Sequence, residues 1–211
     1  TLHNASYIEE HDIAVGDQIV ITRSGDVIPK FVKMEQKGPN KVSFPESCPS
    51  CLHDLKREGV DLMCKNKNCP EKRLNKFVHY VKTMEIDGVG EGILKKLLLN
   101  DLIKDLPDLY KVSAIDIAEL NNMGEKSAKL VIKGIYDKQI VEPHKFLASI
   151  GIPHLGRGSS KRLIDHLHNK YPELSAKEII MHIIDKMTLG ELITVDGFAE
   201  KSGSELIEGL M

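Results

Sequence analysis

The spacing of hydrophobic and polar residues changes along the chain. Residues 7–44 carry β-branched residues in short alternating runs, such as 17–22 and 30–34, which are separated by turns rich in glycine and proline. From about residue 71 the apolar residues recur with the period of a helix. Two such faces are Leu74, Phe77, Val78 and Val81, and Ile93, Leu94, Leu97 and Leu98. We therefore expect a β segment followed by a long α-helical region.

Four loops in the helical region repeat one pattern. The shared form is an apolar residue, a glycine position, a second apolar residue and a second glycine position, and a polar residue then opens the next helical segment. These loops, called loops 1 to 4 below, span residues 86–90, 120–124, 151–156 and 195–199. Only loop 1 keeps both glycines, Gly88 and Gly90. Asn122 and His154 replace the first glycine in loops 2 and 3, and Ala199 replaces the second glycine in loop 4.

Loops of this form favour the binding of an anion. They aim backbone N–H groups at the start of a helix, where the helix dipole favours negative charge, and glycine lets the anion approach closely. A single glycine between two helices is more often an ordinary turn, but four copies, whose first glycine positions are 34, 32 and 43 residues apart, favour a shared role. Phosphate is the expected anion, and loop 1 is the best candidate site. One of the other loops could have only a packing role. The residues expected to contact it are Gly88, Gly90, Gly124, Lys126, Ser127, Gly156, Gly158, Ser159 and Gly197.

Composition limits the class of protein. The chain has 211 residues, of which 41% are hydrophobic, and this is enough for packed cores. Its apolar runs are too short to cross a bilayer, and its first residues lack the pattern of a signal peptide. We therefore expect a cytoplasmic protein that does not engage a membrane.

The charge is unlike that of a protein that binds nucleic acid through bulk charge, because the formal net charge is −2. Cations are instead concentrated locally, and residues 65–82 contain six Lys and Arg residues against Glu71 alone. The other clusters are Lys126 and Lys129 after loop 2, and Arg157, Lys161 and Arg162 after loop 3. A solvated helix face is the alternative for any one cluster. The coincidence of clusters and loops favours local binding of phosphates.

All four cysteines of the chain follow the spacing C-x2-C-x12-C-x4-C. They are Cys48, Cys51, Cys64 and Cys69. Two short turns joined by a small hairpin would bring four sulfur atoms around one ion, and a closed set of thiolates is typical of structural zinc. Two disulfides and a redox C-x-x-C are the alternatives, which a cytoplasmic location and the second cysteine pair make less favourable. We therefore expect a structural Zn²⁺ site.

These features resemble NAD-dependent DNA ligase of the bacterial type. The resemblance rests on the opening T-L-H-N, on Gly16-Asp17, on R-S-G-D-V-I-P at 23–29, on the four cysteines, on I-D-G-V-G at 86–90 and on G-E-K-S-A at 124–128. It runs through the whole chain in the order of the family. In that family an adenylation domain is followed by an OB-fold, a four-cysteine zinc finger, four helix-hairpin-helix motifs and usually a BRCT domain.

The resemblance implies a multi-domain, mainly α-helical chain. A partial OB-fold would cover residues 1–45, the zinc finger 46–72 and the helix-hairpin-helix domain 73–211. The chain would begin part-way through the OB-fold and stop before any BRCT domain. We expect three or four strands in the partial OB-fold, fewer than the five of a closed barrel, and therefore an unpaired sheet edge.

The implied function is the sealing of nicks in duplex DNA during replication and repair. The enzymes of this family transfer AMP from NAD to a lysine and then to the 5′-phosphate of the nick, with Mg²⁺. No K-x-D-G occurs in this sequence, so the lysine that receives AMP is absent and no catalytic residue is expected. The resemblance implies that this chain grips the backbone of nicked duplex DNA without sequence preference, that NAD and Mg²⁺ bind outside it, and that it is inactive alone.

The resemblance also places Arg23 against the DNA backbone, and Val27 and Ile28 against the groove near the nick. The alternatives are a solvated turn for Arg23 and an ordinary strand core for the two apolar residues. Two other classes of protein remain open at this point. A non-catalytic DNA-binding or architectural module of a repair protein would fit everything after residue 45, and a domain that binds protein partners would fit the near-neutral charge.

Overall fold

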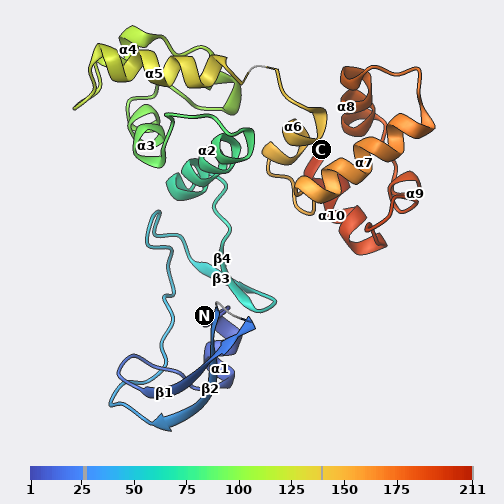
Figure 1. Cartoon of the computed structure of the whole chain (residues 1–211). Helices are drawn as coiled ribbons and strands as arrows, with labels where there is room; N and C mark the ends of the chain where they lie inside the picture. Colours follow the sequence, from blue (N-terminus) through green and yellow to red (C-terminus); the bar gives the residue numbers. More distant parts are fainter. Residues whose placement is uncertain (26–27, 139, 211) are drawn as a thin grey trace. The chain divides into compact units, whose positions relative to one another are not determined.

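The computed structural model describes residues 1–25, 28–138 and 140–210. The chain divides into two compact units, Thr1–Lys72 and Arg73–Met211. The described residues are mainly helical, with small two-stranded sheets confined to the first unit (Figure 1). The predicted change from strands to helices is therefore confirmed. Among the described residues, no helix has both the length and the apolar character needed to cross a membrane.

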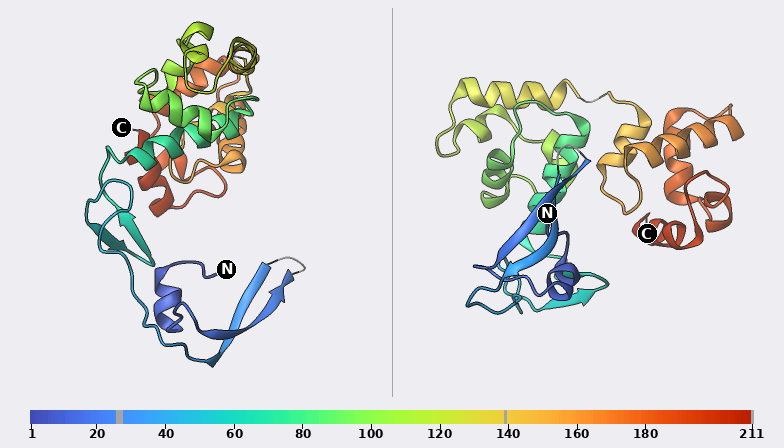
Figure 2. Two further views of the ribbon diagram at one scale, coloured as in Figure 1. Left: turned by 90° about the vertical axis from the view of Figure 1, so that its left-hand side faces the viewer. Right: turned by 60° about the horizontal axis from the view of Figure 1, so that its bottom comes forward.

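The first unit begins with helix α1 (Ala5–Glu10) and an antiparallel ribbon of β1 (Gln18–Ser24) and β2 (Ile28–Gln36). The ribbon pairs residue 18 with 36 and residue 24 with 28, and two register shifts interrupt the ladder. Such irregularities bend and twist a two-stranded ribbon, and Figure 2 shows the twist of this one from two sides.

The sequence-based prediction for this segment is corrected in two respects. Helix α1 was not expected, although Asn4 caps it by accepting a 2.9 Å hydrogen bond from the N–H of Tyr7. The described part of residues 1–45 also holds two strands rather than three or four. After β2 the chain turns instead, because the carboxylate of Asp17 accepts 2.7 Å bonds from the N–H groups of Ala14 and Gly38. These bonds lower the pKa of Asp17, with the Ala14 bond contributing most.

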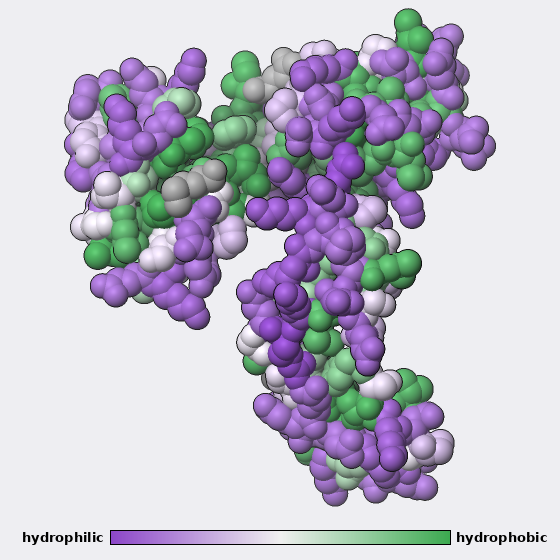
Figure 3. All heavy atoms as spheres, turned by 180° about the vertical axis from the view of Figure 1, so that it is seen from behind, coloured by the Kyte–Doolittle hydropathy of each residue, from purple (hydrophilic) through white to green (hydrophobic). Residues whose placement is uncertain are grey.

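Helix α1 packs on the ribbon through aromatic rings. The ring of Tyr7 lies edge-on to buried Phe31 of β2 at 6.5 Å, and the ring of His11 lies edge-on to it at 5.1 Å. Other apolar side chains of the ribbon, including Ile21 and Val32, are exposed. A hollow of about 780 Å³ lies beside the ribbon and is lined by Leu2, Ile8, Ile13, Ala14, Val15, Asp17, Ile19, Asn40, Lys41, Val42, Ser43 and Phe44. Figure 3 shows hydrophobic residues at the surface of this unit.

A second hairpin follows, formed by β3 (Leu55–Glu58) and β4 (Asp61–Cys64). Its turn contains Gly59 with a φ of +57°, a left-handed conformation that glycine adopts without strain. This hairpin is the predicted connection between the two cysteine pairs. Within the part of the chain that the structure describes, β1 pairs only with β2, and β3 only with β4.

The second unit is an array of helices. Its elements are α2 (Pro70–Met84), α3 (Glu91–Leu99), the 3-10 helix η2 (Leu106–Tyr110), α4 (Ala114–Ala118), α5 (Glu125–Tyr136), α6 (Pro143–Ser149), α7 (Arg157–Lys170), α8 (Ala176–Asp185), α9 (Leu189–Leu192) and α10 (Glu200–Leu210). Helices α2 to α5 enclose one apolar core, and helices α6 to α10 enclose another. Fully buried members of the two cores include Phe77, Leu94, Leu97 and Ile117, and Leu147, Leu163, Leu167 and Ile183.

Candidate functional site

The four cysteine sulfur atoms converge on one point. All four Sγ atoms lie within 4.8 Å of one another. Cys48 and Cys69 are 3.9 Å apart and buried, and Cys51 and Cys64 are 3.5 Å apart and half-buried. A disulfide requires about 2.05 Å between its sulfur atoms, so the four thiols are free. The convergence predicted from the spacing is confirmed.

The geometry fits a tetrahedral metal ion. Four sulfur atoms about 2.3 Å from a central zinc ion would stand about 3.8 Å from one another, which lies between the Cys51–Cys64 and Cys48–Cys69 sulfur distances. The cluster offers only sulfur, and a complete set of four leaves no position for water. Such a set suits a soft ion in a structural role. When bound, the ion would hold the β3–β4 hairpin to the start of α2.

The surroundings favour thiolate at two of the four cysteines. Hydrogen bonds from the Asn66 side chain and then from the N–H of His53 lower the pKa of Cys51 to about 6. Cys69 immediately precedes α2, and the N–H of Lys72 in the first turn of that helix lowers its pKa. Thiolate at the start of a helix is stabilised by the free N–H groups and by the helix dipole. The sequence had no local signal for the Asn66 contact.

The four repeated loops share a left-handed residue at the first glycine position. Each lies between two helices: α2 and α3, α4 and α5, α6 and α7, and α9 and α10. The first glycine position is left-handed in all four, with φ values of +77° at Gly88, +59° at Asn122, +66° at His154 and +87° at Gly197. Few residues with a side chain adopt this conformation, so its recurrence at Asn122 and His154 agrees with the alignment of the loops made from the sequence.

The second glycine position caps the helix that follows. Gly90, Gly124 and Gly156 precede α3, α5 and α7 in extended conformation and offer no side chain to the first N–H groups, and among the described residues no other side chain caps these helices. A Cβ atom added to any of the three glycines would meet open space. By contrast, Ser113, Ser175 and Thr188 cap α4, α8 and α9 with their hydroxyl groups. In α3 the N–H of Ile93 donates to the Gly90 carbonyl at 3.0 Å, and the other first-turn N–H groups of α3, α5 and α7 have no capping side chain among the described residues and could meet an external anion.

Loop 4 differs from the other three. The N–H of Ala199 donates a 3.0 Å hydrogen bond to the hydroxyl of Ser202. The guanidinium group of Arg162 covers the loop, because its Nη2 atom would be 2.7 Å from a Cβ atom added to Gly197. An anion would have to displace these contacts. Loop 4 is therefore the least accessible of the four anion sites.

The predicted cations fall into two groups. Those after loop 3 are engaged within the chain: Arg157 with Glu85 at 3.0 Å, Lys161 with Asp165 at 2.8 Å, and Arg162 with the carbonyl of Asp196 at 3.0 Å. After loop 2, Lys129 lies 3.9 Å from the Glu125 carboxylate. Lys126 has no ion-pair or hydrogen-bond partner among the described residues, and Ser127 beside it is exposed. The structure thus brings an uncommitted cation to the open cap of loop 2 but not to that of loop 3.

The remaining predicted contacts lie at several places. The hydroxyl of Ser159 donates to the carbonyl of His154 at 2.6 Å, so this donor serves loop 3 itself. Gly158 is exposed in the first turn of α7. Arg23 is exposed on β1, and the side chain of Ile28 on β2 is 54% exposed, which argues against a strand-core role for it. Val27 lies outside the described residues.

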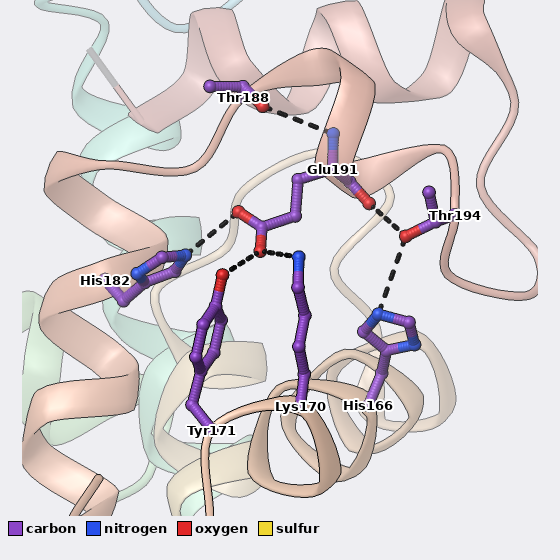
Figure 4. A network of polar contacts seen from close by, with 7 residues as sticks. All are labelled: His166, Lys170, Tyr171, His182, Thr188, Glu191 and Thr194. Carbon is purple, nitrogen blue, oxygen red and sulfur yellow. Dashed lines mark hydrogen bonds and ion pairs between the residues drawn. The ribbon is translucent and has the colours of Figure 1, made fainter.

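A cluster of polar side chains surrounds Glu191 in α9, the helix that leads into loop 4 (Figure 4). Its carboxylate lies 2.7 Å from Lys170 Nζ, 2.9 Å from His182 Nε2 and 3.0 Å from the hydroxyl of Tyr171. Burial opposes ionisation of Glu191, but hydrogen bonds from Lys170, His182 and Tyr171 outweigh it and lower its pKa to about 2. No pattern in the sequence indicated this cluster, which ties α7, α8 and α9 together.

Comparison with known proteins identifies the chain. Residues 1–42 match the family model described as the NAD-dependent DNA ligase OB-fold domain. Over 99% of its length the chain is 35% identical to a DNA ligase of Helicobacter hepaticus, 33% identical to one of Sulfurovum sp. and 30% identical to one of Oceanobacillus iheyensis. It spans 31% of the length of each of these relatives. The chain therefore belongs to the family of the NAD-dependent DNA ligases.

Proposed function

We propose that this chain is the DNA-binding part of an NAD-dependent DNA ligase that seals nicks in duplex DNA. Residues 1–45 would be a partial OB-fold, residues 46–72 a zinc finger and residues 73–211 a helix-hairpin-helix domain with four motifs. The similarity to DNA ligases supports the proposal that the parent protein is a DNA ligase. The open helix starts at Gly90, Gly124 and Gly156 are the observation that carries the proposed DNA contact.

The proposed contact is with the phosphate backbone. First-turn N–H groups of a helix bind phosphate oxygens without reading a base edge, and a nearby lysine adds charge without adding sequence information. Lys126 beside the cap of loop 2 supports this assignment, as does the exposed position of Arg23 on β1. The chain would therefore bind duplexes of unrelated sequence alike. Nicked duplex DNA is the proposed partner because the curated relatives are named DNA ligases.

The chemistry would be supplied by other parts of the enzyme. NAD and Mg²⁺ are proposed to bind outside this chain, because no lysine in a K-x-D-G stretch is present to accept AMP. Zn²⁺ is the proposed ion of the four-cysteine site, since all four ligands are soft sulfur atoms. Its role would be to shape the segment between the proposed OB-fold and the helical unit. The chain alone would bind nicked DNA and leave it unsealed.

A salt titration tests this proposal. Fluorescence anisotropy of labelled nicked duplexes of two unrelated sequences is measured with the chain at several salt concentrations. If about four to six phosphates are neutralised, the logarithm of the binding constant should fall against the logarithm of salt concentration with a slope of roughly −4 to −5. Both sequences should give the same slope and affinity. A strong preference for one sequence, or binding that does not respond to salt, would refute the proposed backbone contact.

A further inference from the structure

In two of the helices that follow the repeated loops, a cation at the same position binds a backbone carbonyl group of another loop. The sixth residue after the cap is Lys96 in α3 and Arg162 in α7. Lys96 Nζ donates to the carbonyl oxygen of Asn121 in loop 2 at 2.6 Å. Arg162 Nε donates to the carbonyl oxygen of Asp196 in loop 4 at 3.0 Å. Equivalent cations on two helices therefore bind equivalent carbonyl groups of two turns.

The helices that follow loops 2 and 4 contact loops 1 and 3 in return, and they do so through residues at the same position. The tenth residue after the cap is Gly134 in α5 and Gly209 in α10. A Cβ atom added to Gly134 would stand 1.8 Å from the carbonyl oxygen of Asp87 in loop 1, and one added to Gly209 would stand 2.9 Å from the Ile152 side chain in loop 3. Loops 1 and 2 thus form one reciprocal pair, and loops 3 and 4 form another. Because the bond between a cation and a carbonyl group occurs in both pairs, we infer that it is part of how two such loops pack together.

The carbonyl group that Lys96 binds is part of the central peptide of a tight turn. The N–H of Met123 donates to the carbonyl of Leu120 at 2.9 Å and closes this turn. Of its two central residues only Asn122 is left-handed, which is the type II arrangement. Rotation of the central peptide would convert it to type I and move the Asn121 carbonyl away from Lys96. Asn adopts the left-handed state more readily than most residues with a side chain but less readily than glycine, so Asn122 holds the type II form less firmly than a glycine would.

We propose that Lys96 is a positioning residue for the phosphate site at loop 2. It binds no phosphate itself. By holding the Asn121 carbonyl it keeps the turn in the type II form and so keeps the cap at Gly124 and the first turn of α5 aligned for an anion. This inference rests on the proposed function, because the site it serves is the proposed DNA contact. Lys126, which has no partner among the described residues, is the cation at loop 2 that would meet the phosphate.

Three variants separate positioning from direct contact. Lys96→Met removes the donor and keeps much of the apolar side chain. Lys96→Met combined with Asn122→Gly removes the donor and places at the left-handed position the residue that adopts this state without strain. Lys126→Met is the reference for loss of a direct phosphate contact. For each, the affinity for a labelled duplex is measured at several salt concentrations, and hydrogen exchange of the Met123 amide reports on the turn without DNA.

Lys96→Met should weaken binding about tenfold, the worth of one charge-assisted hydrogen bond, with the salt slope unchanged. Exchange at Met123 should become faster. Adding Asn122→Gly should restore most of the affinity and the slow exchange, because glycine favours the type II turn even without the bond from Lys96. Lys126→Met should instead reduce the magnitude of the slope by about 0.9.

Two results would overturn the inference. A salt slope reduced by Lys96→Met, with no rescue by Asn122→Gly, would make Lys96 a direct phosphate contact. Unchanged affinity and unchanged Met123 exchange would show that the bond to Asn121 has no positioning role. Failure of the parent chain to bind any duplex would refute the proposed function as well, and with it the DNA part of this inference. Binding by the parent chain together with either of the first two results would refute the inference alone.

Discussion

Gly134 of α5 lies directly against Asp87 of loop 1, so that a Cβ atom on Gly134 would stand 1.8 Å from the Asp87 carbonyl oxygen. Real Cβ atoms do not approach backbone oxygen so closely, and here the obstacle is backbone rather than a flexible side chain. The absence of a side chain at Gly134 is therefore what lets α5 and loop 1 pack together.

Gly134→Ala should consequently destabilise the helical unit, because α5 and loop 1 would have to separate. We expect a loss of about 2 kcal/mol or more in the free energy of unfolding, in the range found for overpacked cores. Chemical denaturation measures it. Gly92→Ala in α3 is the matched control, since an added Cβ there meets open space and should cost nothing. Equal stability of the two variants would contradict the close contact.

The four-cysteine site should hold about one Zn²⁺ per chain, as determined by elemental analysis of the purified protein. Cys64→Ser removes one of four ligands and should abolish stoichiometric zinc and loosen the β3–β4 hairpin, because metal binding and local folding are coupled. Lys67→Ala, in the exposed loop between Cys64 and Cys69, should keep the metal. Four thiols that react rapidly with an alkylating reagent in metal-free native protein would contradict this prediction.

Glu191 should make the free energy of unfolding decrease at acidic pH. Its pKa is lowered to about 2, so its contribution is fully present above the ordinary carboxyl pKa and is lost as the pH falls from about 4.5 towards 2. Glu191→Gln should cost about 3 kcal/mol at pH 7, since a carboxylate held by Lys170, His182 and Tyr171 becomes neutral.

Unfolding of the parent and of Glu191→Gln by denaturant at several pH values checks this. The difference between the two proteins should shrink steadily below pH 4.5 and approach zero near pH 2. Glu173→Gln is the matched control, because Glu173 is an exposed carboxylate between α7 and α8 with no hydrogen-bond or ion-pair partner among the described residues, so its substitution should leave stability unchanged at every pH. A difference for Glu191→Gln that stays constant with pH would contradict the assigned ion-pair cluster.

Local sequence patterns predicted much of the site. The cysteine spacing predicted the convergence of four sulfur atoms, because the two knuckles and the hairpin between them are all local features. The alignment of the four loops placed Asn122 and His154 at the position of Gly88, and the structure has all three in the left-handed conformation. A tight turn is formed by a few adjacent residues, so its left-handed position can be predicted from the local sequence even where glycine is replaced.

Contacts between distant residues were not predictable in this way. The pairing of Arg157 with Glu85 and of Arg162 with the Asp196 carbonyl arises only when helices pack, so a count of charges near loop 3 overstated the cations available to a partner. Gly134 did leave a signal, since a glycine within an amphipathic helix often marks a close approach of backbone. Helix α1 was missed because residues from 7 onward were assigned to the β segment, although Ala5–Glu10 contain a single β-branched residue, Ile8.

In the proposed function, the open starts of α3, α5 and α7 hold the phosphate backbone of DNA. The most direct test is the affinity for a nicked duplex of a variant with Gly90→Leu, Gly124→Leu and Gly156→Leu, compared with Gly190→Leu. All four glycines have open space for a side chain, but Gly190 lies in α9, away from the three caps. The triple variant should fold and bind at least about 100-fold more weakly, through lost N–H to phosphate bonds, while Gly190→Leu should bind like the parent. A folded triple variant with unchanged affinity would contradict the claim.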